Sequence, residues 1–212
     1  MSPKVTQAYK ELKRQKIMEA GKIVFIRKGY EQTTMKDIIE ESGLSKGGVY
    51  LYFSSKEEVF SALLEVSDNE YFSFIQRLLE EDGTQWDAIT KLSEFIKRKI
   101  IEANDELAPA IYEYFFSVKR NNQVPPLLVK RYTRAQNCVK SLLERGVANG
   151  EFHPVVSLEE ISKFMVSFMD GLSVNMIHLN SEIIGLDSQI DQMLFYLRHA
   201  LQRSNSDKKN ML

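Results

Sequence analysis

Cysteine and proline are scarce in this chain of 212 residues, and their scarcity excludes some classes of protein. The single cysteine, Cys138, cannot form a disulfide within the chain, which suggests a reducing compartment. Five prolines and ten glycines are few for a fold of many short strands and turns. Leu, Ile, Glu, Lys and Met are frequent instead, so the composition favours a mostly helical protein.

Long apolar segments are also missing. No run of about 18 apolar residues is present, so we expect no membrane span. The N-terminal stretch MSPKVTQAYKELKRQK lacks the apolar core of a signal peptide. Because 43% of the residues are apolar, the chain can still form a substantial core. We therefore expect a cytoplasmic protein with no membrane partner.

Motifs of catalysis and cofactor binding are missing too. The three histidines, His153, His178 and His199, have no metal-ligand spacing. Neither a G-x-S-x-G nucleophile motif nor a Walker phosphate loop occurs. The sequence therefore predicts no enzyme activity, no catalytic residue, no bound metal and no cofactor.

Positive charge is concentrated at one end of the chain. The net charge is −1, yet residues 1–36 contain nine Lys or Arg residues and only three acids. This segment carries +6 and the remainder of the chain −7. A basic end on an acidic chain is typical of a patch that binds an anionic partner such as nucleic acid. A solvated, lysine-rich helix is the alternative interpretation.

The spacing of apolar residues predicts an all-α fold of about nine helices. Hydroxyl residues three positions before an acid, such as Thr34, Ser55 and Thr84, indicate helix starts, and Gly43 indicates a stop. We expect helices over residues 6–28, 34–42, 45–53, 55–81, 106–119, 126–148 and 187–203, and two more that start near residues 84 and 157. The polar residues 204–212 should form a disordered tail.

Residues 34–53 match a helix-turn-helix, in which the second helix reads DNA. The short turn Ser42-Gly43-Leu44 joins the two helices. With Ser45 as the N-cap, a rotation of about 100° per residue places Val49 and Phe53 on the side that packs onto the core. The residues on or beside the opposite side are Gly47, Gly48, Tyr50, Leu51 and Tyr52.

This opposite side is suited to a major groove, which is about 12 Å wide. Gly47 and Gly48 cost the helix roughly 1 kcal/mol each, but they allow its backbone to approach base edges closely. Leu51 can contact a thymine methyl group, while Lys46 and the tyrosine hydroxyls can reach phosphates. Lys56, at the N-terminus of the next helix, is a further candidate for a phosphate contact.

Residues 13–60 resemble the DNA-binding module of the TetR family of bacterial transcriptional regulators. The matching residues are Ile17, Ala20, Phe25, Gly29, Tyr30, Thr33, Thr34, Ile38, Gly43–Gly47, Val49, Tyr50, Tyr52, Phe53, Ser55–Glu57 and Val59. The DNA-contact residues that the resemblance and the helix geometry imply are Thr33, Thr34, Ser45, Lys46, Gly47, Gly48, Tyr50, Leu51, Tyr52 and Lys56. Gly48 departs from the family pattern, in which Thr or Ser is common, and Tyr52 stands where a smaller polar ring is common.

The resemblance also implies a homodimer that binds a small effector. The last two expected helices have apolar faces wider than one contact surface needs, so we expect a four-helix interface between subunits. The expected interface residues are Ile177, Met193, Tyr196 and Leu197. A two-fold dimer would place its reading helices about 34–36 Å apart, or a multiple of a helical turn, on a palindromic operator. The alternative is that these helices are buried in their own subunit.

An effector pocket is expected among the helices that follow the DNA-binding module. Its candidate lining residues are Trp86, Tyr112, Glu113, Phe116, Tyr132, Met165, Phe168, Met169 and Asp170. Aromatic and methionine side chains suit an adaptable apolar pocket, but each of these residues can also be plain core. Glu113 and Asp170 lie in apolar helical settings, where a buried carboxylate needs a cationic ligand or a basic residue as its partner.

The sequence thus predicts a DNA-binding regulator of transcription, and the family resemblance implies a repressor that a small effector releases from DNA. We expect a DNA-binding domain over residues 1–56 and an effector-binding and dimerisation domain over residues 57–203. An effector-independent activator or architectural protein with a filled core is the alternative. A helical enzyme or small-molecule carrier is a third possibility.

Overall fold

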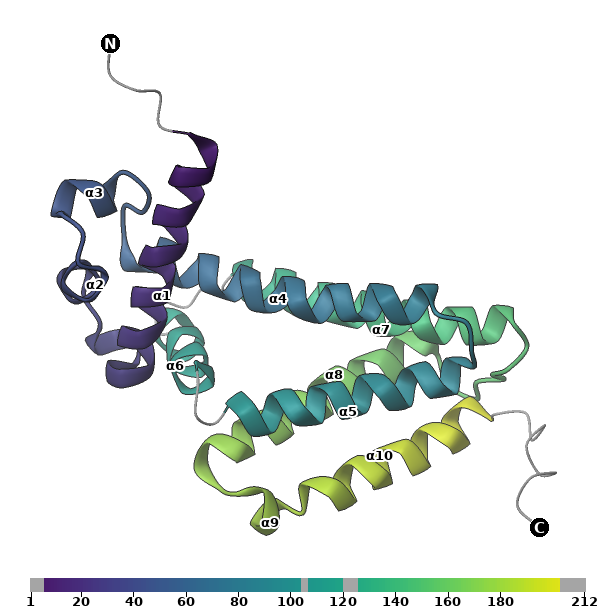
Figure 1. Ribbon diagram of the computed structural model, residues 1–212. Helices are drawn as coiled ribbons and strands as arrows, with labels where there is room; N and C mark the ends of the chain where they lie inside the picture. Colours follow the sequence, from purple (N-terminus) through teal and green to yellow (C-terminus); the bar gives the residue numbers. More distant parts are fainter. Residues whose placement is uncertain (1–5, 104–106, 120–125, 203–212) are drawn as a thin grey trace. The chain divides into compact units, whose positions relative to one another are not determined.

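The computed structural model describes residues 6–103, 107–119 and 126–202, and every regular element in these residues is a helix (Figure 1). The helices are α1 (Gln7–Gln32), α2 (Met35–Ser42), α3 (Lys46–Tyr50), α4 (Lys56–Glu80), α5 (Gln85–Ala103), α6 (Ala108–Lys119), α7 (Pro126–Ala148), α8 (Leu158–His178), α9 (Ser181–Ile184) and α10 (Leu186–Leu201). The all-α prediction is confirmed. The four-residue helix α9 is not among the expected helices, and the predicted tail at residues 204–212 lies outside the described residues.

The described helices belong to two compact units. The first contains the chain up to residue 70 together with α6, and the second contains residues 71–103 and 126–202. The boundary expected at residues 56 and 57 would separate α6 from α1. In the structure α6 packs against α1, so it belongs with the N-terminal helices.

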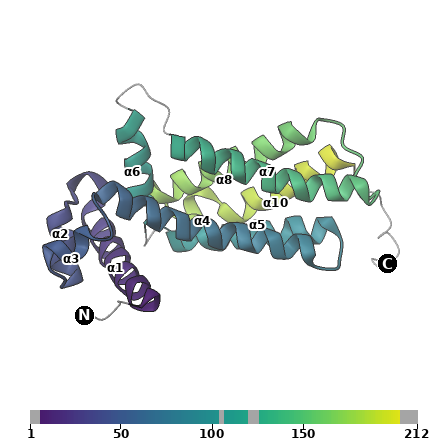
Figure 2. The ribbon, with the colours of Figure 1, turned by 90° about the horizontal axis from the view of Figure 1, so that it is seen from above.

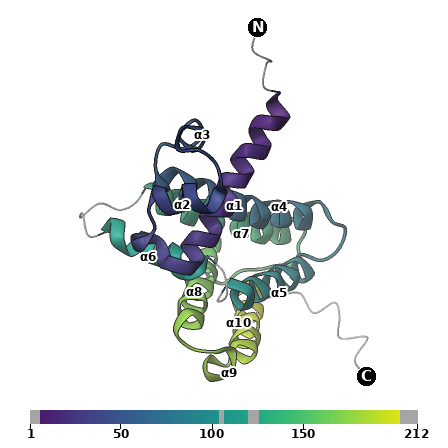
Figure 3. The same cartoon turned by 60° about the vertical axis from the view of Figure 1, so that its left-hand side comes forward.

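The first unit is built on the inner face of α1. Ile17, Val24 and Phe25 on this face are fully buried. A Cβ atom on Gly21 would lie 2.5 Å from Cγ1 of Val59, so the absence of a side chain lets α1 and α4 cross in close contact. Figures 1 and 3 show α3 at the same end of this unit as the N-terminal part of α1, whereas α6 lies at the other end of α1.

The second unit is a helical bundle in which α8 contacts α5, α7 and α10 (Figure 2). Its core includes Ile89, Leu92, Leu142, Leu143, Ile161, Met165, Leu172 and Ile190. Glu151 caps α5, because its carboxylate accepts hydrogen bonds from the N–H groups of Gln85 and Trp86 at 2.6 and 3.0 Å. None of the helices in the described ranges is long and apolar enough to cross a lipid bilayer.

Candidate nucleic-acid interface

The short helix α3 is anchored on one side and open on the other. Ser45 caps it, because its Oγ accepts a hydrogen bond from the backbone N–H of Gly48 at 3.1 Å. Val49 and Phe53 are buried and hold the helix on the core of the first unit. The anchor expected from helical spacing is therefore present.

The open side of α3 carries no acidic residue. Leu51, directly after the helix, is 83% exposed, and Tyr50 is 42% exposed. A Cβ atom on Gly47 would meet nothing within 4 Å, so this glycine leaves a strip of backbone open to a partner. The exposed Lys46 ammonium lies 5.9 Å from the centre of the Tyr50 ring. Lys46, Gly47, Tyr50 and Leu51 form a surface that we call the reading face.

The hydroxyl groups of the two threonines predicted to contact DNA form hydrogen bonds within the first unit. Thr33 is 1% exposed, and its hydroxyl donates a hydrogen bond to the carbonyl oxygen of Gly29 at 2.6 Å. The Thr34 hydroxyl donates to the Asp37 carboxylate at 2.8 Å and accepts from the Asp37 N–H at 3.3 Å. Thr33 is therefore unavailable to DNA, which corrects the prediction. Thr34 has one hydroxyl proton, so it can donate to a phosphate only by giving up Asp37.

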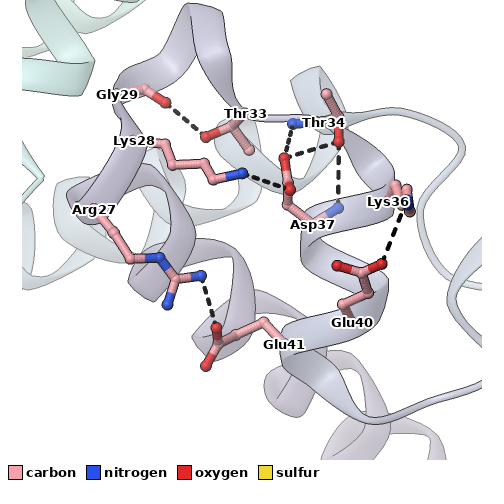
Figure 4. Close-up of polar contacts among 9 residues, drawn as sticks. All are labelled: Arg27, Lys28, Gly29, Thr33, Thr34, Lys36, Asp37, Glu40 and Glu41. Atoms are coloured by element: carbon pink, nitrogen blue, oxygen red, sulfur yellow. Dashed lines mark hydrogen bonds and ion pairs between the residues drawn. The ribbon is translucent and has the colours of Figure 1, made fainter.

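Acids on α2 neutralise three of the cations in the basic N-terminal segment (Figure 4). The ion pairs are Arg27–Glu41 at 2.9 Å, Lys28–Asp37 at 2.6 Å and Lys36–Glu40 at 3.7 Å. Hydrogen bonds from Lys28 and Thr34 lower the pKa of the Asp37 carboxyl to about 2, so it stays ionised at neutral pH. Part of the positive charge counted along the sequence is thus cancelled at α2.

Lys56, a predicted phosphate contact, is bound to the end of α1. Its ammonium donates hydrogen bonds to the carbonyl oxygens of Tyr30 and Glu31 at 2.8 and 3.0 Å. It also lies 4.6 Å from the centre of the Tyr30 ring. Cations stabilise the carbonyl end of a helix. The structure therefore gives Lys56 an internal role in place of the predicted one.

Comparison with known proteins identifies the family. The description "Bacterial regulatory proteins, tetR family" matches residues 17–63, and "Tetracyclin repressor-like, C-terminal domain" matches residues 88–186. The helix-turn-helix transcriptional regulator YfiR of Bacillus subtilis is 38% identical over 202 residues, which cover 95% of this chain and 98% of that protein. The chain belongs to the TetR family.

Two more distant similarities also extend over most of the chain. The helix-turn-helix transcriptional repressor KstR2 of Mycolicibacterium smegmatis is 23% identical over 155 residues, which cover 72% of this chain and 74% of that one. The structure of Salmonella enterica GusR superposes with a TM-score of 0.70 at 20% identity and covers 93% of this chain and 98% of GusR. The TetR family consists of transcriptional regulators rather than enzymes, and this chain carries its DNA-binding domain.

The internal role of Lys56 in this TetR protein can be tested directly. Lys56→Met keeps the length of the side chain but removes two charge-assisted hydrogen bonds. We expect it to lower the free energy of unfolding by about 1–2 kcal/mol, since the site is partly exposed. The salt dependence of DNA binding should stay unchanged. Urea unfolding and binding titrations at several salt concentrations measure the two effects.

Lys46→Met is the matched control for this prediction. Lys46 is exposed on the reading face, so its replacement should change stability by less than about 0.5 kcal/mol. It should lower the slope of log affinity against log salt by about one unit for each protomer. If Lys56→Met lowers the slope of log affinity against log salt and leaves the free energy of unfolding unchanged, Lys56 contacts DNA as the sequence predicted.

Helix α1 is broken at Gly29, and the break is bound by Glu113, which was predicted to line the effector pocket. At Gly29 the backbone has φ 76° and ψ 174°, which leaves the N–H groups of Tyr30 and Glu31 without helical partners. The carboxylate of Glu113 on α6 accepts both, at 2.6 and 3.2 Å. We call this arrangement the α1–α6 clamp. Glu113 is therefore a structural residue of the first unit and not the pocket residue that was predicted.

Aromatic rings surround the clamp. Tyr30 is 5% exposed, and its ring centre lies 4.7 Å from that of Tyr114 and 4.8 Å from that of Phe60. Its hydroxyl donates to the Glu57 carboxylate at 3.1 Å. Burial, and then the Glu57 charge, raise the pKa of the Tyr30 hydroxyl above its usual range. Tyr30 and Glu113 are 83 positions apart in the chain, so no local sequence pattern indicates that α6 packs at the Gly29 break.

The residues predicted to line an effector pocket belong to both units. Tyr112, Glu113 and Phe116 lie on α6 in the first unit, whereas the others lie on α5, α7 and α8 in the second. Phe116 is 64% exposed, so it does not line an enclosed cavity.

The remaining pocket candidates, which lie in the second unit, differ in how deeply they are buried. Trp86, Met165 and Met169 are buried in the core, while Tyr132 and Phe168 are half-buried. Asp170 on α8 is exposed, yet surrounding protein atoms desolvate its carboxyl and raise its pKa, while the charge of Arg131 opposes this shift. A cavity of about 140 Å³ at the turn between α4 and α5 is lined by residues such as Thr84 and Lys91, and none of the candidates lines it.

The predicted interface residues divide between the core and the surface. Met193 and Leu197 are each 1% exposed and pack in the core of the second unit, which removes them from a subunit interface and corrects the prediction. Ile177 is half-buried. Tyr196 is 59% exposed and remains a candidate. Helical spacing explains the division, because positions four apart share a face and Tyr196 lies beside that face.

Aromatic residues that the sequence analysis did not assign to the interface are exposed on the same two helices. Phe164 on α8 is 44% exposed and stacks with Phe168, at 5.8 Å between ring centres. Phe195 on α10 is 53% exposed and lies 5.7 Å from Tyr196. The other exposed residues on these sides are Ser167, Gly171, Asn175 and His178 on α8, and Ser188, Gln192 and His199 on α10. Exposed acids border this surface, because Glu160 lies one turn before Phe164 and Asp191 one turn before Phe195. We call the surface formed by the exposed aromatic and uncharged residues the aromatic face.

Metal-binding chemistry finds no support in the described part of the chain. No three His, Cys, Asp or Glu side chains are grouped there in a way that could hold a metal ion. The features that stand out in the TetR protein are therefore the reading face, the α1–α6 clamp and the aromatic face.

Proposed function

We propose that this protein is a dimeric transcriptional repressor whose two α3 helices read a palindromic operator and which a small-molecule effector releases from DNA. The reading face carries this proposal. It is exposed, contains no acid, offers open backbone at Gly47 and is fixed from behind by Val49 and Phe53. A helix of this kind fits the major groove, where Leu51 meets thymine methyl groups and Lys46 meets phosphates.

The aromatic face supports the dimer. Subunit interfaces are enriched in aromatic residues and depleted of charge at their centre, as this face is. A two-fold dimer through α8 and α10 would repeat the same face on both subunits. Two reading helices would then contact half-sites about 34–36 Å apart, or a multiple of a helical turn, on one face of the duplex.

The α1–α6 clamp supports release by an effector. α6 belongs to the first unit, yet in sequence it lies between α5 and α7, which belong to the second. A ligand that favours another arrangement of α5 and α7 can therefore act on α6, and through Glu113 on α1. Coupling between two such sites is typically worth about 1–3 kcal/mol. The relative KstR2 is named a repressor, which agrees with this direction of control.

The experiment that tests the proposal selects DNA from a pool of randomised duplexes with the wild-type protein and then measures binding to the enriched sequence. We expect a palindromic site and a Leu51→Glu variant that binds it about 100-fold more weakly, because it loses a base contact and brings a carboxylate close to phosphates. Val66→Glu is the control, because Val66 is 58% exposed on α4, away from the reading face. No enriched sequence, or equal binding by Leu51→Glu, would contradict the proposal.

Release is tested separately. The small-molecule ultrafiltrate of a bacterial lysate is added to the complex of wild-type protein and selected duplex. If the ultrafiltrate is divided into fractions, at least one of them should dissociate a repressor of the proposed kind from the duplex. In cells, a reporter gene placed behind the selected site should be repressed when the protein is made. Binding that no fraction changes would favour an effector-independent regulator.

A further inference from the structure

The N-terminal part of α1 is not held by core packing. The helix begins after the N-cap Thr6, whose hydroxyl oxygen accepts a hydrogen bond from the Tyr9 N–H at 3.3 Å. The first buried residue is Ile17, and none of residues 7–16 is buried. Almost three helical turns therefore extend past the three-helix module, although short helices gain most of their stability from packing. We call residues 7–16 the α1 extension.

The extension carries positive charge that is not neutralised. It contains Lys10, Lys13, Arg14 and Lys16, with Glu11 as its only acid. Within the described residues none of these four cations forms an ion pair. The cations near α2 are, in contrast, each paired with an acid of that helix. Among the described residues of the first unit, the cations of the extension and Lys46 are thus without an acidic partner.

Two of these cations point to the side of α1 that faces the rest of the module. Lys10 and Lys13 continue the spacing of three and four residues that runs through the buried Ile17, Ala20 and Val24. One turn along, the Arg14 guanidinium lies 5.2 Å from the centre of the Phe53 ring, just beyond α3. The extension therefore lies at the same end of the first unit as α3, as Figures 1 and 3 show. Arg14 connects it with the residues that follow α3.

We propose that the α1 extension binds the sugar–phosphate backbone of duplex DNA next to the groove read by α3. This proposal rests on the proposed function and adds to it a second contact in each half-site. Lysines act as mobile point charges, which suits phosphates better than base edges. Arg14 is occupied by Phe53 and by the Met18 sulfur at 3.2 Å. We therefore assign the contacts to Lys10 and Lys13 on the side toward the module, together with Lys16, which is exposed on a neighbouring side of the helix. Each phosphate that is neutralised releases counterions, and binding becomes more sensitive to salt.

The test compares wild type with a triple variant, Lys10→Gln, Lys13→Gln and Lys16→Gln, on the selected operator. The slope of log affinity against log salt should fall by about one unit for each lysine in each bound protomer. At physiological salt we expect affinity to fall at least about tenfold. The unfolding midpoint should change little, because none of these side chains is buried and the ring contact of Lys13, 5.2 Å from the centre of Tyr9, is at the surface. Hydroxyl-radical footprinting should show sugars next to the α3 groove that wild type protects and the variant does not.

The matched control removes the same charge elsewhere. Lys91→Gln, Lys140→Gln and Lys163→Gln together change three lysines of the second unit, all of them paired with glutamates. A slope that falls equally in both triple variants, or a footprint that is the same for wild type and the extension variant, would overturn the proposal. The extension would then be a solvated helix that acts at most through net charge. Failure of the proposed function can be distinguished from failure of this inference, because in the first case the wild-type protein itself would select no duplex.

Discussion

Replacing Glu113 with alanine is expected to lower the free energy of unfolding by about 2–3 kcal/mol and to weaken operator binding. The carboxylate accepts hydrogen bonds from the N–H groups of Tyr30 and Glu31, and no helical carbonyl can replace it at the break after Gly29. Hydrogen bonds to a charged group contribute about 1.5–3 kcal/mol each, and the more exposed one contributes less. Urea unfolding measures the stability change.

Operator binding should fall for a separate reason. The residues after the break lead through Thr33 into the cap of α2, so a loosened break lets the helix-turn-helix shift relative to α1. We expect about tenfold weaker binding at a temperature where the variant remains folded, with the salt slope unchanged. Glu65→Ala, on the exposed side of α4, is the control and should alter neither quantity. Wild-type stability and binding in the Glu113 variant would show that water replaces the carboxylate.

Placing a charge on the aromatic face should have the largest effect on DNA binding. Phe195→Asp is expected to convert a dimer into monomers, because an unpaired carboxylate at the centre of an apolar interface is costly to desolvate. A monomer holds only one half-site, so affinity for the full operator should fall by at least about 100-fold. The isolated fold should persist, since Phe195 is 53% exposed in the protomer. Sedimentation and operator titration measure the two changes.

Val155→Asp is the control for the aromatic face. Val155 is 59% exposed in the same unit but lies in the segment between α7 and α8. This variant should stay dimeric and bind the operator as wild type does. If Phe195→Asp remains dimeric, the prediction is wrong and the subunits meet on another surface. The half-site spacing of the selected operator would then give the distance between the two reading helices in that other dimer.

Local features of the first unit could be derived from the order of residues because the interactions behind them span few positions. The Thr34 capping box, the left-handed Gly43 at the end of α2 and the Ser45 cap of α3 all join residues three apart or closer. Helical spacing likewise placed Val49 and Phe53 on the inner side of α3. The all-α fold and the TetR family membership rest on such short patterns.

Residue identity and helical period alone determined that this chain has a helix-turn-helix with an open, acid-free side on α3, and that its body is helical. Tertiary structure decided which of the suggested side chains are free. Lys56 binds the carbonyl groups and Glu113 the N–H groups of Tyr30 and Glu31, just after the break in α1. Met193 turns into the core while Tyr196 stays exposed. Each of these outcomes depends on which helix packs against which. That information lies in contacts between residues far apart in the chain, and no local pattern contains it.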